Sequence, residues 1–433
     1  MRIVVAGAGH GGLLAAGLLA RTGHDVTVLE KKQPDALGHD WEDRFTLSLL
    51  ENYLGIAVSD LPEGSVRVRG DCVFVSPFRA GRVEVRYPEE RAQRVMWRKS
   101  LIELLLNFAR DNGADLHFGV SVTSPLTESG RVSGVMTDAG VFPADLVVDA
   151  CGVFSPLRRN LPATFGVERD VRRGDLFYAY RAYFDRRPTE TDLPFEVYLC
   201  HNGEQGLSWY CANPDSADIL IGRIDPLSPQ KVEAEIAAFR AEHPEAGESL
   251  LHGGQYGFIP VRRPLTKMIA DGYAAVGDSA FMTTPMNGMG IDLSLHAGKL
   301  LADTVASCTG PVSAEVLWQY NRMFHTLYGG DAAKNEGLKN ALLTLPGEGV
   351  EFLFTSGVIQ SSDLDGGGEN MDVQTMLQKL SAGVGQPAWF GAVLRGVLRG
   401  AQVRALYRSA PKTYDPSAVR IWSRRIESLD IRL

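Results

Sequence analysis

The feature that most constrains the fold is a glycine-rich segment near the N-terminus, VVAGAGHGGLLAAGLLARTGHDVTVLEKK. It places Gly7, Gly9 and Gly12 between a strand pattern and a helix pattern, and Glu30 ends the next strand pattern. In such a βαβ unit the glycines allow a tight turn, close approach of the backbone to a pyrophosphate, and close helix packing. A carboxylate at the end of the second strand accepts hydrogen bonds from ribose hydroxyls. The segment therefore predicts a Rossmann-type site for NAD or FAD, and Glu30 disfavours the 2′-phosphate of NADP.

The rest of the chain alternates between two kinds of pattern. Short strand candidates separated by turn residues run from residue 65 to 86 and from 170 to 224, which is typical of an antiparallel sheet. Helical spacing dominates after Gly310. We therefore expect an α/β protein with an antiparallel (α+β) insert, divided into three regions. These are a discontinuous cofactor-binding domain (1–64, 91–165 and 265–310), an antiparallel sheet domain for the substrate (65–90 and 166–264) and a helical C-terminal region (311–433).

The composition argues against several classes of protein. A net charge of -8 disfavours nucleic acid as a partner, because duplex-binding proteins carry basic surfaces. The five cysteines are scattered without a CxxC pair, so we expect neither a disulfide framework nor a metal site. No apolar run reaches the roughly 18 residues that a membrane helix needs, and no signal-peptide pattern precedes the first strand. We therefore expect a cytoplasmic protein.

Two further signatures lie far along the chain. In ADLVVDACGVFSPLRRNL an apolar strand pattern leads into Asp149 and Gly152, and in GYAAVGDSAFMTTPMNGMGI another leads into Gly277 and Asp278. Asp278 has the alternative role of an ordinary helix cap, but the upstream fingerprint favours a cofactor contact. Arg98 begins the helix pattern RKSLIELLL, where the helix dipole disfavours a cation, so an anion such as a pyrophosphate would explain it.

The three signatures together resemble the FAD-dependent oxidoreductases built like p-hydroxybenzoate hydroxylase. Within that group, HGGQYGFIPVRRPLTKMIADGYAAVGDSA and LSWYCANPDSADILIGRI are similar to the geranylgeranyl reductase family, whose Trp-centred motif Trp209 matches. The resemblance covers residues 1–310 and implies a Rossmann-like FAD-binding domain of the p-hydroxybenzoate hydroxylase type, interleaved with the antiparallel sheet domain. It implies that Asp278 accepts hydrogen bonds from the ribityl hydroxyls. The cofactor-binding residues implied are Gly7, Gly9, Gly12, Glu30, Lys31, Arg98, Val122, Asp149, Gly152, Gly277, Asp278, Pro285, Asn287, Gly288, Met289, Gly290 and Ile291.

The segment Pro285–Ile291 would, by the same resemblance, pass beside the isoalloxazine ring. The N-terminus of the helix that follows would stabilise the negative charge left near N1 after hydride uptake. Gly288 and Gly290 would let the backbone approach a flat ring. The sequence departs from the family at Asn287, where a glycine is usual, and in WYCAN, where Phe-Pro commonly follows the Trp. GHDWEDRF (38–45) also lacks the cysteine that many members carry.

The resemblance implies hydride transfer from reduced flavin N5 to a carbon–carbon double bond of an isoprenoid or similar apolar substrate. Two alternatives stay open: an FAD-dependent monooxygenase of group A type acting on an aromatic or polyketide substrate, and a non-enzymatic prenyl-binding carrier. An apolar substrate needs an apolar lining, and the middle sheet offers aromatic residues that ordinary sheet packing would also explain. They are Tyr178, Tyr180, Tyr183, Tyr198, Trp209 and Tyr210. His201 and Tyr210 are candidate proton donors, and Trp209 and Asn287 are candidate substrate contacts.

Reductant and membrane contact depend on weaker patterns. No second GxGxxG follows a strand pattern, so the external reductant, NAD(P)H or a ferredoxin-type protein, has no binding domain of its own here. WFGAVLRGVLRGAQVRALYR (389–408) alternates Arg with apolar residues at helical spacing. We expect a helix packed on the protein body, with peripheral contact to an anionic membrane as the alternative. The sequence leaves the oligomeric state open.

Overall fold

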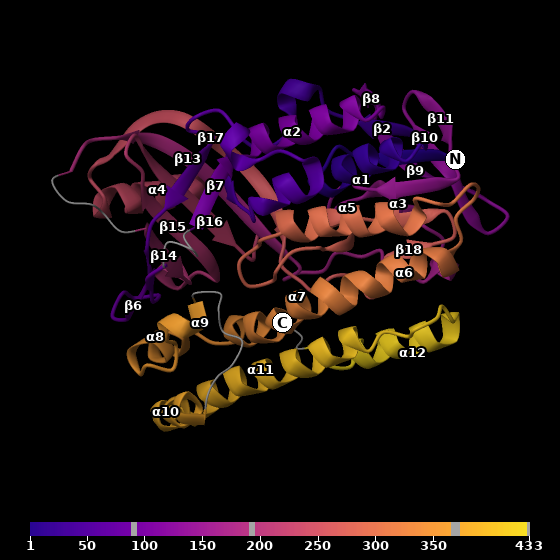
Figure 1. The fold of residues 1–433 in the computed structure, drawn as a ribbon. Coiled ribbons are helices and arrows are strands. Elements are labelled where there is room, and N and C mark those ends of the chain that lie inside the picture. The colour runs from indigo at the N-terminus through magenta and orange to yellow at the C-terminus, as the bar shows by residue number, and fades with distance from the viewer. Residues whose placement is uncertain (88–92, 190–194, 365–372, 431–433) are drawn as a thin grey trace.

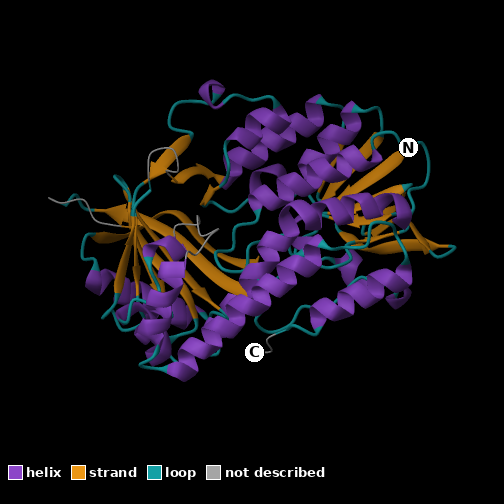
Figure 2. Ribbon diagram, turned by 60° about the horizontal axis from the view of Figure 1, so that its bottom comes forward, coloured by secondary structure: helices purple, strands orange, loops and turns teal. Residues whose placement is uncertain are grey.

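The computed structural model describes residues 1–87, 93–189, 195–364 and 373–430. Two sheet systems lie side by side, and helices from the C-terminal part of the chain run beneath both of them (Figures 1 and 2). The expected α/β architecture with an antiparallel insert and a helical C-terminal part is present.

A six-stranded sheet forms the first system, in the order β18-β19-β12-β1-β2-β8. The strands are β1 (Arg2–Ala6), β2 (Asp25–Glu30), β8 (Asp115–Phe118), β12 (Leu146–Asp149), β18 (Ile269–Ala270) and β19 (Tyr273–Ala275). All neighbours are parallel except β18 and β19. The central strands are continuous apolar runs, as expected for a parallel sheet covered on both faces. β1, α1 (His10–Arg21) and β2 form the predicted βαβ unit.

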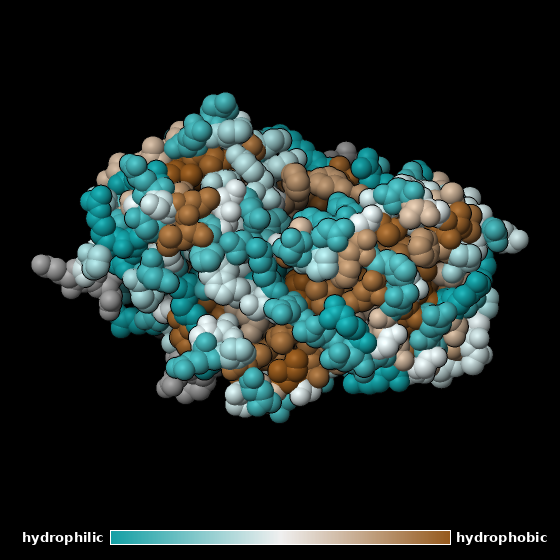
Figure 3. All heavy atoms as spheres, turned by 90° about the horizontal axis from the view of Figure 1, so that it is seen from above, coloured by the Kyte–Doolittle hydropathy of each residue, from teal (hydrophilic) through white to brown (hydrophobic). Residues whose placement is uncertain are grey.

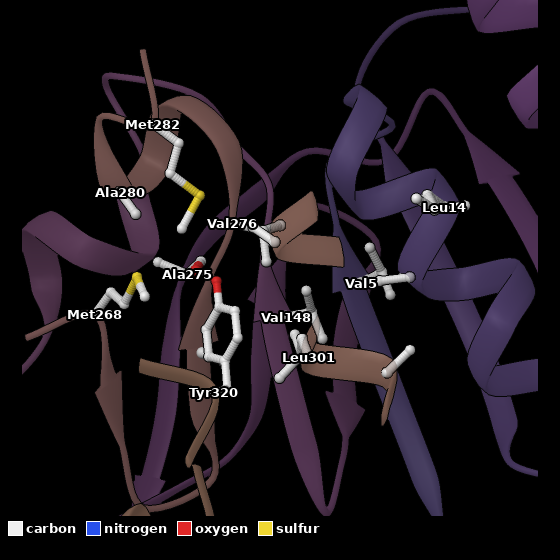
Figure 4. Packing of buried hydrophobic residues seen from close by; sticks show 14 of the residues in the cluster. Val5, Leu14, Val148, Met268, Ala275, Val276, Ala280, Met282, Leu301 and Tyr320 are labelled. Carbon is white, nitrogen blue, oxygen red and sulfur yellow. Dashed lines mark hydrogen bonds between the residues drawn. The ribbon is translucent and has the colours of Figure 1, made fainter. Parts of the chain in front are cut away.

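Helix α1 packs against α2 (Arg98–Asp111) and α5 (Ile291–Val305). Glycine permits the contact with α5, because a Cβ at Gly11 or at Gly298 would lie 2.4 Å from a backbone oxygen of the other helix. Figure 4 shows Val148 of the sheet beside Leu301 of α5, and the hydroxyl of Tyr320 pointing toward Ala275. That hydroxyl donates to the Ala275 carbonyl oxygen at 2.7 Å, so the buried polar group is satisfied.

A seven-stranded sheet forms the second system, in the order β17-β13-β16-β15-β14-β5-β6. The strands are β5 (Cys72–Val75), β6 (Arg82–Val85), β13 (Leu176–Arg186), β14 (Phe195–Leu199), β15 (Gly206–Ala212), β16 (Ser216–Arg223) and β17 (Ala246–Pro260). All pairs are antiparallel except β14 with β5. One face is covered by α4 (Pro229–Glu242), whose Phe239 packs on buried sheet residues. The opposite face meets the short strand β3 (Glu42–Arg44), which lies next to the first system.

Two small sheets complete the strand structure. One joins β9 (Val122–Glu128), β10 (Arg131–Thr137) and β11 (Gly140–Pro143). The other joins β3, β7 (Gln93–Trp97) and β4 (Val66–Arg69). The pairing of β4 with β7 crosses the boundary expected between residues 90 and 91. Residues 66–85 are therefore shared between this small sheet and the seven-stranded one, and the expected boundary at residues 90 and 91 itself lies outside the described residues.

The short helix α3 (Pro156–Asn160) follows β12, and the remaining helices make up the C-terminal part of the chain. They are α6 (Ala314–Phe324), α7 (Gly330–Leu343), α8 (Gly347–Thr355), α9 (Ser361–Leu364), α10 (Val373–Gly383), α11 (Pro387–Arg408) and α12 (Pro416–Glu427). Helix α11 packs closely along α7, and α12 continues the same layer (Figure 1). Close packing requires glycine, because a Cβ at Gly396 would lie 2.6 Å from the Gly337 carbonyl oxygen.

The outer surface mixes hydrophilic and apolar side chains, and the apolar ones gather in separate patches on the face seen in Figure 3. Within the described ranges, no helix combines the length and the apolar character needed to traverse a bilayer.

Candidate functional site

Two helix N-termini without side-chain caps meet at the carboxyl edge of the six-stranded sheet. Gly9 precedes α1 and Gly290 precedes α5, and neither helix start has a side-chain cap. The first internal bonds are from Leu13 N to Gly9 O and from Ser294 N to Gly290 O, both 2.9 Å. The preceding N–H groups of each helix therefore point outward without protein acceptors in the described chain. Together with the positive ends of the helix dipoles, they form a place suited to anions.

The fingerprint glycines have steric reasons to be glycine. Gly7 has a φ of +97°, and a Cβ there would lie 2.4 Å from the Ala150 carbonyl oxygen. At Gly12 a Cβ would lie 2.6 Å from the Ala150 Cβ. At Gly9, by contrast, the nearest atom would be 3.5 Å away, so this residue leaves the helix entrance open. These roles match the division of labour in a dinucleotide-binding turn.

Glu30 lies at the end of β2 beside that turn. Its side chain is buried, and its two oxygens accept from Ala8 N at 2.8 Å and Lys32 N at 2.9 Å. Each oxygen keeps a free lone pair for a ribose hydroxyl. Lys31 is exposed. Val122 begins β9 just after the segment in which Val120 N bonds to Glu30 O at 3.0 Å, which places it near the same end of the site.

Asp149, expected among the cofactor contacts, has another role. Its carboxylate is fully buried and accepts four hydrogen bonds. The donors are Ser155 Oγ at 2.5 Å, Tyr273 Oη at 2.7 Å, Ser279 Oγ at 2.9 Å and Cys151 N at 3.1 Å. The carboxylate therefore supports the neighbouring loops, and a contact of Asp149 with the cofactor stays a prediction. Gly152 takes part in the same link, since its N–H donates to Ser279 Oγ at 3.0 Å.

Asp278 lies in the short 3₁₀ turn Gly277–Ala280 and differs from Asp149. Its half-buried carboxylate receives no hydrogen bond from the residues that the structure describes. Burial raises the pKa of this carboxyl to about 6, and the nearby Arg98 opposes the rise. Gly277 has a φ of +64° and faces Ser294 of α5. Asp278 is thus an open acceptor beside the α5 N-terminus.

The loop Pro285–Ile291 leads into α5. Thr284 N bonds to Met289 O, and Gly288 N bonds to Thr284 O, both at 2.9 Å. Asn287 is exposed, and its Oδ1 accepts from Met289 N at 3.2 Å, so its side chain closes the loop. Gly288 has a φ of +67°, and a Cβ there would lie 2.9 Å from Ile259 Cγ2 of β17. The loop therefore stands directly against the seven-stranded sheet.

Arg98 has its anion within the protein. Its guanidinium forms a bidentate ion pair with Asp43, whose Oδ1 lies 2.9 Å from Nη2. Nη1 also lies 3.1 Å from His39 Nδ1, and the guanidinium stacks 5.4 Å from the Trp41 ring centroid. Asp43 thus supplies the negative charge that the sequence argument assigned to a pyrophosphate. Against the effect of burial, the negative charges of Asp43 and Asp278 raise the pKa of Arg98, so the guanidinium lies near Asp278 as well.

The proposed proton donors His201 and Tyr210 lie on the wrong face of the seven-stranded sheet. Tyr210 donates to Glu245 at 2.5 Å, and the buried ring of His201 bonds to Glu235 of α4 at 2.9 Å. Both rings pack against Phe239 of α4. This corrects the sequence interpretation, since the α4 face points away from the loop Pro285–Ile291.

Two of the expected aromatic residues lie on the face toward β3. The Tyr183 hydroxyl accepts from Glu42 N at 2.9 Å. Trp209 donates from Nε1 to Asp218 at 3.2 Å and lies below Arg181, whose guanidinium is 4.9 Å from its ring centroid. Tyr178 and Tyr180 instead contact Phe258 and Tyr256 near the sheet edge, and Tyr198 packs on Phe239.

Two buried polar atoms beside the site were missed by the sequence reasoning. His10 Nε2 and Trp41 Nε1 have no hydrogen-bond partner within the described ranges. Both side chains neighbour Arg98, and burial together with this arginine lowers the pKa of His10 to about 4. The sequence signal that could have pointed to His10 is its place as a polar residue between Gly9 and Gly12 of the glycine fingerprint.

The residues fit an FAD molecule. The α1 N-terminus would hold the pyrophosphate, Glu30 the ribose and Asp278 the ribityl chain, and the orphaned nitrogens leave donors or acceptors for a bound group. In the part of the chain that the structure describes, no group of three or more His, Cys, Asp and Glu side chains could hold a metal ion.

Comparison with known proteins agrees with this geometry. A digeranylgeranylglycerophospholipid reductase of Sulfolobus acidocaldarius is 23% identical over 75% of both chains. A kynurenine 3-monooxygenase of Salinispora arenicola is 27% identical over 75% of this chain and 77% of its own. The crystal structure of a geranylgeranyl bacteriochlorophyll reductase-like protein from Thermoplasma acidophilum superposes with a TM-score of 0.72 at 16% identity, covering 91% of this chain and 98% of that one.

This superposition confirms the fold class expected from the sequence. The model of the FAD binding domain family matches residues 1–326, which is three quarters of the chain. The chain belongs to the FAD binding domain family and is an FAD-dependent oxidoreductase.

Proposed function

We propose that this protein reduces carbon–carbon double bonds of an isoprenoid or similarly apolar substrate. The observation that carries the proposal is a set of apolar side chains on the face of the seven-stranded sheet toward β3, here called the Trp41 cluster, which reaches the loop Pro285–Ile291 at Gly288. Its buried members are Trp41, Ala179 and Tyr183, with Phe177, Trp97 and Ile259 packed against them. A Cβ added at Gly288 would lie 2.9 Å from Ile259 Cγ2, and one added at Gly257 would lie 2.6 Å from Trp41 Cη2, so these two side chains pack directly on the two glycines.

Bound FAD, once reduced, supplies the hydride for one carbon of the double bond. The other carbon takes a proton, and the electrons come from an external reductant, NAD(P)H or a ferredoxin-type protein. The protein's own part is to hold the cofactor and to exclude water. In this proposal the uncapped α5 N-terminus stabilises negative charge next to the loop, and Gly288 and Gly290 present no side chain to the ring.

Tyr183 replaces His201 and Tyr210 as the candidate proton donor. Its hydroxyl oxygen accepts the Glu42 N–H, and its own proton has no acceptor among the described residues. Burial raises the pKa of Tyr183 well above its ordinary value, so the group stays protonated at neutral pH. Tyr183→Phe should leave FAD reduction intact and slow reoxidation of the reduced flavin by the substrate.

The similarity to a digeranylgeranylglycerophospholipid reductase and to a geranylgeranyl bacteriochlorophyll reductase-like structure supports the isoprenoid substrate class. The kynurenine 3-monooxygenase relative supports the second candidate, hydroxylation of an aromatic or polyketide substrate. A prenyl-binding carrier without flavin is disfavoured, because the cofactor set Gly7, Gly9, Gly12, Glu30 and Asp278 is intact.

One anaerobic experiment separates these candidates. The protein with its FAD is reduced by dithionite without oxygen, and isoprenoid or aromatic compounds are then added while flavin absorbance is followed. Reoxidation by an isoprenoid alkene, with the saturated product found by mass spectrometry, is the expected result. Substrate-dependent consumption of oxygen and NAD(P)H, with no anaerobic turnover, would establish the monooxygenase instead.

A lipid substrate makes peripheral membrane contact through residues 389–408 part of this proposal. Arg395 and Arg399 are exposed on α11 beside Val397 and Leu398, which are 42% and 56% exposed. Residues 387–427 carry eight basic and two acidic side chains, although the whole chain has a net charge of -8. Arg404 and Arg408 pair with Asp331. Arg395 and Arg399, exposed beside apolar residues, are therefore the pair that favours anionic lipid. Flotation with vesicles should show binding that requires anionic lipid and is lost in an Arg395→Glu, Arg399→Glu double variant.

A further inference from the structure

The imidazole of His10 is a polar group that the glycine fingerprint does not explain. His10 is the first residue of α1 and stands between Gly9 and Gly12 in the sequence. Its Nε2 is buried and has no hydrogen-bond partner in the described parts of the chain. Burying a polar nitrogen without a partner costs free energy, so such atoms are rare unless a ligand or water supplies the partner.

The surroundings of His10 keep the ring neutral. Its charged neighbours are Arg98 and Asp43, which are paired with each other. Burial and the positive guanidinium lower the pKa of His10 to about 4. A neutral imidazole offers one N–H donor and one acceptor nitrogen. Neither Arg98 nor Asp43 uses the Nε2 atom, so the first residue of α1 carries a nitrogen without a partner among the described residues.

The same helix entrance is built for an anion. Gly9 supplies no side-chain cap, and the N–H groups of residues 10–12 have no acceptor in the described chain. Gly9 leaves room at this point, since an added Cβ would have its nearest neighbour at 3.5 Å. An anion at these N–H groups lies next to the first side chain of the helix, which is His10.

We propose that His10 is a cofactor ligand whose Nε2 hydrogen-bonds a phosphate oxygen of the FAD pyrophosphate. His10 thereby adds a side-chain contact to a site otherwise made by backbone N–H groups. The inference depends on FAD binding and is independent of which substrate the reduced flavin meets. His10 belongs to the α1 N-terminus, whereas Asp278, which would hold the ribityl chain, belongs to the turn Gly277–Ala280 near the α5 N-terminus.

The test compares affinities for FAD and for ADP, which contains the diphosphate but no ribityl chain. Dilution of the FAD-loaded, full-length protein releases FAD, and the fluorescence of free flavin gives its Kd. Displacement by added ADP gives the Kd for ADP. The variants are His10→Leu, His10→Gln, whose amide nitrogen restores a donor, and Asp278→Asn. His24→Leu is the matched control, because His24 lies beyond the opposite end of α1.

His10→Leu should weaken both FAD and ADP about tenfold, the loss of one hydrogen bond to a charged group. His10→Gln should stay within about threefold of the unmodified protein, and His24→Leu should be unchanged. Asp278→Asn should weaken FAD alone. Unchanged ADP affinity in His10→Leu would overturn the proposal. An equal loss in His10→Gln would overturn it too, because that result would assign the effect to packing.

Discussion

Replacement of Asp149 by asparagine tests whether this residue supports the site rather than binds the cofactor. The carboxylate accepts two hydrogen bonds on each oxygen. Asparagine keeps one oxygen, so two donors lose their acceptor and meet an NH₂ group instead. At about 1.5 kcal/mol or more for each hydrogen bond to a charged group, the variant should lose about 3 kcal/mol of stability.

The corresponding shift in the thermal midpoint is modest because the chain is long. For 433 residues the unfolding entropy is about 0.9 kcal/mol/K, so 3 kcal/mol corresponds to a decrease of about 3 °C. The assay is circular dichroism melting of the protein saturated with FAD, together with the Kd for FAD. Asp145→Asn is the matched control, because the Asp145 carboxylate accepts only one hydrogen bond from the described residues, an exposed one from Arg2 N at 2.8 Å. An unchanged midpoint combined with a large rise in Kd would refute the reasoning, since that pattern belongs to a cofactor ligand.

Three further changes address other parts of the structure. The affinity for FAD should be highest above about pH 6 and should fall as the pH drops through 6. The ribityl hydroxyls need the ionised Asp278 carboxylate, and burial raises the pKa of this carboxyl to about 6. In FAD titrations at several pH values, Asp278→Asn should bind FAD more weakly and with no dependence on pH. Gly288→Val should raise the Kd for FAD about tenfold. A β-branched residue at a φ of +67° costs about 1–2 kcal/mol, and its side chain would also press on Ile259. Unchanged affinity would contradict the placement of the flavin ring beside this loop. Gly396→Leu should lower the thermal midpoint, because overpacking against Gly337 costs about 1–3 kcal/mol, and it should leave the affinity for FAD unchanged. A lower affinity would show that the α7–α11 contact affects the cofactor site.

The parts of the site that depend on neighbouring residues could be predicted from the sequence. Gly7, Gly12 and Glu30 lie in one βαβ unit, where spacing alone determines the turn, the helix entrance and the end of the next strand. The antiparallel sheet was also predictable, because its strands carry local patterns of β-branched and aromatic residues.

The parts that depend on distant residues could not be predicted. Arg98 is neutralised by Asp43 from another strand, 55 residues away in the chain. Asp149 is satisfied partly by Tyr273, 124 residues away. Tyr210 and Trp209 are neighbours in β15, and they point to opposite faces because side chains alternate along a strand. The position of α4, which covers one face of the sheet, determines that Trp209 and not Tyr210 lies on the face toward the cofactor region.

The hydrogen bond from Gly152 N to Ser279 Oγ joins residues 127 positions apart. Between them the chain leaves the FAD-binding unit, builds most of the seven-stranded sheet, and returns. The two ends of this excursion are thus fastened to each other and, through Asp149, to the parallel sheet. Strands and loops inside the excursion can be exchanged or lengthened without moving Asp278 relative to the α1 entrance, because loop closure is already secured at its base. Under the proposed function, in which the seven-stranded sheet binds the substrate, that sheet can therefore diversify while the cofactor-binding part stays constant.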